Sequence, residues 1–145
     1  MPEVTRSILV NYTAEEVFHV VNDIESYPLF VPSCFESAIH EQTEGEVLAS
    51  ISFKAMGFTK TLITRNKIQF AERIEIGFVD GPFSHLAGSW EFVPLSEQAS
   101  KAICTLSFTP KSRYAKLAAK TALNKAANSA VDSFHKRIVQ LYGKR

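Results

Sequence analysis

Five alternating runs of apolar and polar residues, followed by one long segment without glycine or proline, constrain the fold of this chain most strongly. The runs lie between Phe35 and Thr109, and each places apolar side chains at every second position. They read VLASISFK, TLITRNKIQF, RIEIGFV, HLAGSWEF and AICTLSF. A period of two over neighbouring runs is typical of antiparallel strands with one buried and one exposed face. The sequence therefore predicts an antiparallel meander.

The segment from Arg113 to Tyr142 predicts one long helix, because it is rich in Ala, Lys and Leu and has no breaker before Gly143. Its apolar positions share one helical face: Leu123, Ala127, Val131, Phe134, Ile138 and Leu141. Ahead of the meander, residues 3–12 predict a strand, and Thr13 predicts the N-cap of a short helix. The prolines of SYPLFVPSC then indicate a bend or a single helical turn. The order predicts a single α+β domain over residues 1–145, with the helix covering a curved sheet.

The chain is unusually rich in phenylalanine, with 11 in 145 residues. Phenylalanine is large and has no polar group, so this number indicates a big core or an apolar pocket. One helix across a strongly twisted sheet leaves space at its ends. Either the phenylalanine side chains fill that space or a ligand does.

The stretch VDGPFSHLAGSW, residues 79–90, contains an acid and a base, but we interpret it as a corner of the sheet. Asp80 is typical of a turn residue that bonds its own backbone, with a glycine and a proline after it. Phe83 and Leu86 then lie at the mouth of the sheet and suit the lip of an apolar cavity. Phe58, in the MGF corner, is a second candidate lip. The alternative is that these side chains only cap the core.

Polar side chains interrupt the apolar positions at two places of interest. Asn66 falls on the face predicted to be buried, where an unpaired polar group is costly. It either bonds the local backbone near a bulge or contacts a ligand. Asn124 lies at the edge of the apolar stripe of the long helix.

Signals for catalysis, metal binding and export are lacking in the sequence. It has no HExxH, P-loop or GxSxG pattern, and the four histidines are scattered. Cys34 and Cys104 are in no CxxC pair, so we expect two buried thiols in a reducing compartment. No signal peptide and no apolar run of about 18 residues is present, so we expect a cytoplasmic protein without catalytic residues, metal or required cofactor.

The net charge of +1 conceals a strong asymmetry. Residues 1–110 carry seven Lys and Arg against fourteen Asp and Glu, whereas residues 111–145 carry nine against one. An acidic body with a basic segment is typical of contact with a polyanion or an anionic membrane. Lys116, Lys120 and Lys125 are the candidate polyanion contacts; the alternative is a solvated basic face. Nothing in the sequence predicts sequence-specific DNA binding.

Four blocks, in order along the chain, carry a family resemblance: NDIESYPLFVPSC, LITRN, FVDGPFSHLAGSWEF and FHKRIVQLYG. They resemble the coenzyme Q-binding START-like family, including its bacterial branch of ribosome association toxins (RatA). The resemblance covers roughly residues 3–143. The family's tyrosine–proline pair corresponds to Tyr27 and Pro28, and its tryptophan to Trp90. The FKAMGF corner departs from the family pattern, which expects a more apolar approach.

The resemblance implies a helix-grip fold, in which a curved antiparallel sheet wraps around the C-terminal helix and encloses a hydrophobic cavity. It implies a non-catalytic protein that binds a ubiquinone-like prenyl lipid and supports respiration. The basic segment described above would bring such a protein into transient contact with the inner membrane. One alternative is a toxin that binds the large ribosomal subunit, blocks subunit joining and inhibits translation initiation; a second is a polyketide cyclase-like enzyme. The candidate cavity residues are Tyr27, Phe30, Phe53, Phe58, Asn66, Phe78, Phe83, Leu86, Trp90, Phe108, Asn124 and Phe134.

Overall fold

The computed structural model describes residues 3–55, 58–111 and 119–145 of the chain. Its elements are β1 (Glu3–Val10), α1 (Ala14–Asn22), the 3₁₀ helix η1 (Ile24–Leu29), β2 (Cys34–Gln42), β3 (Glu46–Ala55), β4 (Phe58–Gln69), β5 (Arg73–Asp80), β6 (Phe83–Pro94), β7 (Ser100–Pro110) and α3 (Ala119–Tyr142).

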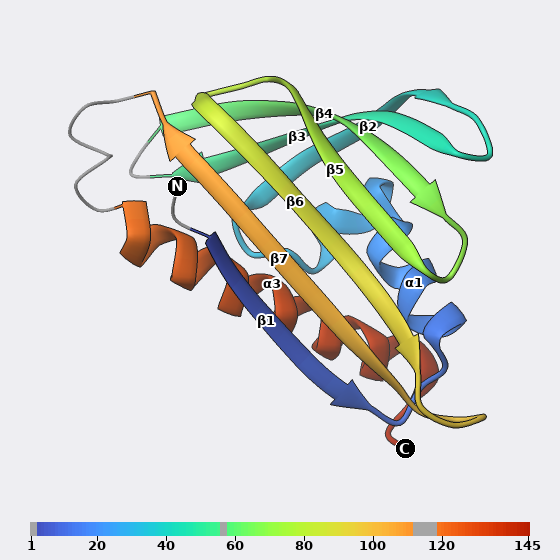
Figure 1. The fold of residues 1–145 in the computed structure, drawn as a ribbon. Coiled ribbons are helices and arrows are strands. Elements are labelled where there is room, and N and C mark those ends of the chain that lie inside the picture. The colour runs from blue at the N-terminus through green and yellow to red at the C-terminus, as the bar shows by residue number, and fades with distance from the viewer. Residues whose placement is uncertain (1–2, 56–57, 112–118) are drawn as a thin grey trace.

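The strands form one antiparallel sheet in the order β1-β7-β6-β5-β4-β3-β2. From β2 to β7 each strand pairs with the next along the chain, which is the predicted meander. β1 then joins β7, with Val10 opposite Ser100 and Glu3 opposite Ser107. Figure 1 shows α3 and α1 on the same face of the curved sheet. The predicted α+β helix-grip fold is therefore confirmed.

The first helix begins where the sequence predicted. The Thr13 hydroxyl accepts a hydrogen bond from the Glu16 N–H (3.1 Å), and the Glu16 carboxylate accepts one from the Thr13 N–H (2.9 Å). This reciprocal pair satisfies two N–H groups that a helix start leaves without partners. The prolines that follow fall in and after η1, so of the predicted bend or single helical turn the helical alternative is correct, as a 3₁₀ helix of six residues.

Strand β2 is the element whose sequence pattern is weakest. It pairs with β3 across two irregularities, between Cys34 and Glu36 and between Ile39 and Glu41. Each bulge shifts the alternation of side chains by one residue, so no period of two runs through the strand. The predicted run of strands from Phe35 onward is correct, but β2 was not among the five alternating runs.

The core lies between the sheet and the helices. On α3, Ala127, Phe134 and Ile138 are buried, as the predicted apolar stripe requires. Leu141 does not follow the stripe, because it is 50% exposed and borders a surface groove beside α1. In the described part of the chain, no helix has the length and apolar character needed to cross a membrane.

Candidate functional site

The inner face of the sheet, which is the face toward α3, carries the side chains that the sequence indicated for a cavity. Thr64 of β4 lies opposite Phe78 of β5, and the next inward position, Asn66, lies opposite Ile76. Trp90 of β6 lies further along the same face. The antiparallel register therefore brings strands that are distant in sequence into common rows across this face.

Four of the predicted residues form one aromatic group, which we call the inner cluster: Tyr27, Phe30, Trp90 and Phe134. The Phe134 ring centroid lies 5.2 Å from that of Trp90, 5.4 Å from that of Tyr27 and 5.4 Å from that of Phe30. All three contacts are edge-to-face, the geometry that aromatic pairs prefer. Trp90 and Phe134 are buried, whereas Tyr27 and Phe30 are half-buried. The inner cluster joins η1, the sheet and α3.

The hydroxyl group of Tyr27 has a structural role. It donates a short hydrogen bond to the carbonyl oxygen of Val21 at the end of α1. Burial, with a smaller contribution from the charge of Asp23, raises the pKa of Tyr27 far above its ordinary value. Tyr27 is therefore a neutral donor that fixes η1 against α1 and presents its ring to the inner cluster.

Three further predicted residues form a second aromatic group, the end cluster, at the β5–β6 turn: Phe78, Phe83 and Phe108. The Phe83 ring centroid lies 6.5 Å from that of Phe78 and 5.3 Å from that of Phe108. All three side chains are half-buried. Leu86 lies opposite Phe108 and is buried, so Phe83 rather than Leu86 forms the exposed part of the predicted lip.

The turn that carries the end cluster has the geometry predicted for a corner. The Asp80 carboxylate accepts a hydrogen bond from the N–H of Gly81 at 2.9 Å. Gly81 has a φ of +153°, a conformation that glycine adopts without strain. Asp80 thus serves the turn, as the sequence indicated.

Two polar side chains interrupt the apolar inner face of β4. Thr64 is 4% exposed and Asn66 is 7% exposed. The Asn66 Oδ1 is buried and accepts no hydrogen bond from the described residues. The expectation that Asn66 bonds its local backbone is therefore wrong for this oxygen, and the other expectation, contact with a ligand, stays a prediction.

The remaining cavity candidates have different surroundings. Phe53 is half-buried on β3, where it lies opposite Cys34. The backbone of Phe58 begins β4, but its side chain is outside the part of the structure that is described. Asn124 accepts a hydrogen bond from Arg6 Nη2 at 2.9 Å, so its amide oxygen is engaged within the protein.

Arg6 is a residue of this region that the sequence did not reveal. From β1 it donates to Asn124, and its Nε donates to Asn128 Oδ1 at 2.7 Å. We call these three residues the arginine clamp, because they connect the edge strand to α3. Two asparagines four positions apart lie on one helix face, which was the available signal.

The three candidate polyanion contacts are only partly described. Lys116 lies outside the described residues, and so does the side chain of Lys120. Lys125 is exposed on α3. Lys125 is therefore the one candidate of the three whose side chain is described, and Lys136 is also exposed on α3.

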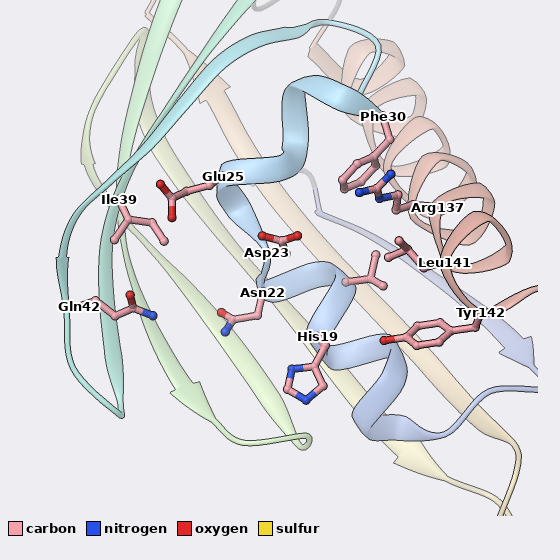
Figure 2. A pocket seen from close by; sticks show the side chains of 11 residues that line it. His19, Asn22, Asp23, Glu25, Phe30, Ile39, Gln42, Arg137, Leu141 and Tyr142 are labelled. Carbon is pink, nitrogen blue, oxygen red and sulfur yellow. The ribbon is translucent and has the colours of Figure 1, made fainter.

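A surface groove lies elsewhere, at the junction of α1 and η1. Figure 2 shows residues of α3 on one side, Ile39 and Gln42 of β2 on the other, and residues of α1 and η1 between them. The groove has a volume of about 430 Å³. Asn22 Oδ1 and Arg137 Nε border it, and both atoms are buried without a partner among the described residues. Its mixed charge distinguishes this groove from the apolar inner face.

The described residues bring no metal-ligand group together, and their two thiols are buried. They contain no group of three or more histidine, cysteine or acidic side chains that could hold a metal ion. Both cysteines are free and buried, and burial raises the pKa of the Cys104 thiol to about 12. A thiol with such a pKa is protonated at neutral pH and is a poor nucleophile.

Comparison with protein families gives a match over most of the chain. Residues 10–135 match the family described as polyketide cyclase / dehydrase and lipid transport. The ribosome association toxin RatA of Vibrio cholerae is 39% identical over 143 residues, which cover 99% of each chain. RatA of Escherichia coli K12 is 37% identical over 145 residues, covering 100% of this chain and 92% of that protein.

More distant relatives share the fold. The mitochondrial coenzyme Q-binding protein COQ10 homolog B of Xenopus laevis is 23% identical over 99% of this chain and 60% of its own length. The Zhui aromatase/cyclase of Streptomyces sp. R1128 superposes with a TM-score of 0.86 at 16% identity, covering 94% of this chain and 93% of that chain. A START superfamily protein of Mycobacterium smegmatis gives 0.85 at 18% identity, covering 96% and 98%. At such identities these structures establish the architecture alone.

Proposed function

We propose that this chain, which belongs to the polyketide cyclase / dehydrase and lipid transport family, associates with ribosomes. It matches the ribosome association toxins of that family from end to end. The observation that carries this proposal is an identity of 37–39% over 99–100% of the chain. In this proposal the protein binds the large ribosomal subunit in the cytoplasm and hinders its joining to the small subunit. It acts by binding, without a chemical step.

The basic C-terminal segment supports contact with ribosomal RNA. Asp132 is the only acid among residues 111–145, and it pairs with Lys136 of the next helical turn at 3.1 Å. Lys125 is exposed, on a different face of α3 from the buried apolar stripe. Lysine contacts to phosphates release bound counterions, so the association is expected to weaken steeply as salt rises.

Charge reversal on the helix tests this proposal. Lys116, Lys120 and Lys125 are replaced by glutamate together, and sedimentation with purified ribosomal subunits is measured. The matched control reverses Lys54, Lys67 and Lys101, which lie outside the basic segment 111–145 and give the same change in net charge. We expect the helix variant to stay near the top of the gradient while the control sediments with the large subunit. Equal sedimentation of the two variants would count against the helix surface.

A second function, binding of a ubiquinone-like prenyl lipid between the sheet and α3, is favoured by the end cluster. Phe78, Phe83 and Phe108 are each half-buried, so part of their apolar surface stays accessible. Burying a prenyl tail there stabilises a complex by about 25 cal/mol per Å² of apolar area. The family description includes lipid transport, and the COQ10 relative is named for coenzyme Q binding.

Solvent extraction of freshly purified protein, followed by mass spectrometry, tests the second function. We expect ubiquinone or a related prenyl compound at close to one molecule per protein. Phe78→Ala should lower that occupancy, whereas the control Phe70→Ala, at a side chain that is 61% exposed, should not. An empty extract from folded wild-type protein would oppose a resident lipid.

A further inference from the structure

Asn66 occupies a position on the inner face where an apolar residue would be expected. It lies opposite Val47 on β3 and Ile76 on β5. Along its own strand, Ile68 is the next residue on the same side. Asn66 is more than nine-tenths buried, and its Oδ1 has no donor among the described residues. A buried acceptor without a donor makes the unliganded fold less stable than a partnered one.

The register places Asn66 between the two aromatic clusters. The row on one side contains Thr64 and Phe78, which belongs to the end cluster. The row on the other side contains Ile74 and Trp90, which belongs to the inner cluster. The Asn66 amide therefore lies on the inner face between two rows that each contain an aromatic side chain.

The row of Asn66 is also the row with the smallest side chain. Ile76 lies opposite Gly88, which lies opposite Leu106. A Cβ added at Gly88 would approach the Ile76 and Leu106 side chains to 3.3 and 3.4 Å. The Ile76 and Leu106 side chains therefore already lie close to the glycine, and a larger residue at position 88 would displace them.

We propose that Asn66 Oδ1 accepts a hydrogen bond from the head group of an amphiphilic ligand that carries a hydroxyl. This inference rests on the proposed lipid-binding function and names its ligand class: a long apolar tail at the end cluster and an O–H donor at Asn66. A hydroquinone or another prenyl-linked hydroxyl has such a donor. An oxidised quinone or a methyl ether has only acceptors, and leaves Oδ1 unpaired.

A matched ligand pair tests the donor requirement. Binding of farnesol and of farnesyl methyl ether is measured by fluorescence of Trp90 for the wild type and for Asn66→Leu. We expect the wild type to prefer the alcohol by about tenfold, which corresponds to one hydrogen bond. Asn66→Leu should bind both ligands equally, and Phe78→Ala should weaken both alike.

A stability measurement supplies an independent readout. Without ligand, Asn66→Leu should unfold at a higher urea concentration than the wild type, because the unpaired amide is gone. A lower midpoint would show that the amide is a structural group and would overturn the proposal. Equal binding of alcohol and ether to the wild type would overturn it while leaving lipid binding intact. Binding of neither ligand would refute the lipid-binding function and this inference together.

Discussion

The Phe134 side chain connects the long helix to the sheet through its contacts with Trp90, Tyr27 and Phe30. It is 7% exposed, so its removal leaves a cavity that the surroundings fill only in part. We predict that Phe134→Ala lowers the free energy of unfolding by about 3–5 kcal/mol, measured by urea denaturation. Leu95→Ala, at a side chain that is 55% exposed, is the control and should change it little. Similar losses in both variants would contradict this account of the core.

Glu16 gives the fold a dependence on acid pH. Partial burial raises its pKa, but hydrogen bonds from Arg145 and the Thr13 backbone outweigh burial and leave the pKa below its ordinary value of 4.5. A carboxyl group whose pKa is lowered by folding stabilises the protein above that ordinary value. This contribution is lost as pH falls through the folded pKa.

Thermal unfolding of Glu16→Gln tests the pH dependence. The wild type should be more stable than the variant at neutral pH, and the difference should shrink at acid pH, as the carboxyl becomes protonated. A difference that stays constant between the two pH values would show that the charge of Glu16 has no part in it.

Single residues differ in how well the sequence predicts them. The Thr13 cap was predictable because its partner is three positions away. The burial of Trp90 and Asn66 was predictable because alternation assigns both to one face. Arg6 was not, because Asn124 and Asn128 lie 118 and 122 positions further along the chain. The lack of a donor for Asn66 Oδ1 among the described residues could not be predicted, because it depends on the positions of all neighbouring donors.

At the scale of elements, the arginine clamp fastens the edge strand β1 to α3. We predict that Arg6→Ala and Asn128→Ala each destabilise the protein, and that the double variant loses less than the two losses together. The coupling should be about 1 kcal/mol, as for a hydrogen bond to a charged group near the surface. A double-mutant cycle by urea denaturation measures it. Strict additivity would show that the contact does not stabilise the fold.

Elements with a regular pattern were predicted and irregular ones were not. The alternation of β3 to β7 survives over most of their length because their inner positions face the helices, with register shifts between Ile63 and Thr64 and between Phe83 and His85. The bulges of β2 break its alternation, so its place at the sheet edge came only with the coordinates. The stripe of α3 failed at Leu141 because this side chain borders a groove, while Ile138 of the same turn lies in the core.

At the scale of the whole molecule, the fold was more predictable than the function. The same helix-grip fold was predicted by the alternating runs, by the long helix and by the family blocks. All three reflect the burial of apolar side chains. The choice between prenyl lipid and ribosome depends on which ligand or surface is used, and a shared fold does not decide it. The sequence alone favoured the lipid, whereas the relatives at 37–39% identity favour the ribosome.

The salt dependence of ribosome association is a property of the whole molecule, because it reports the summed charge of the basic segment. We predict that binding weakens by more than tenfold between about 50 mM and about 200 mM salt. Filter binding or sedimentation at a series of salt concentrations measures it. Affinity that stays constant across the series would indicate an apolar contact in place of phosphate contacts.

We propose above all that this protein binds the large ribosomal subunit and hinders its joining to the small subunit. The most direct measurement mixes purified small and large subunits with the protein under conditions that favour joining, and separates the products on a sucrose gradient. We predict fewer joined ribosomes and more free subunits, with the protein in the large-subunit fractions. An unchanged yield of joined ribosomes, with the protein remaining at the top of the gradient, would contradict it.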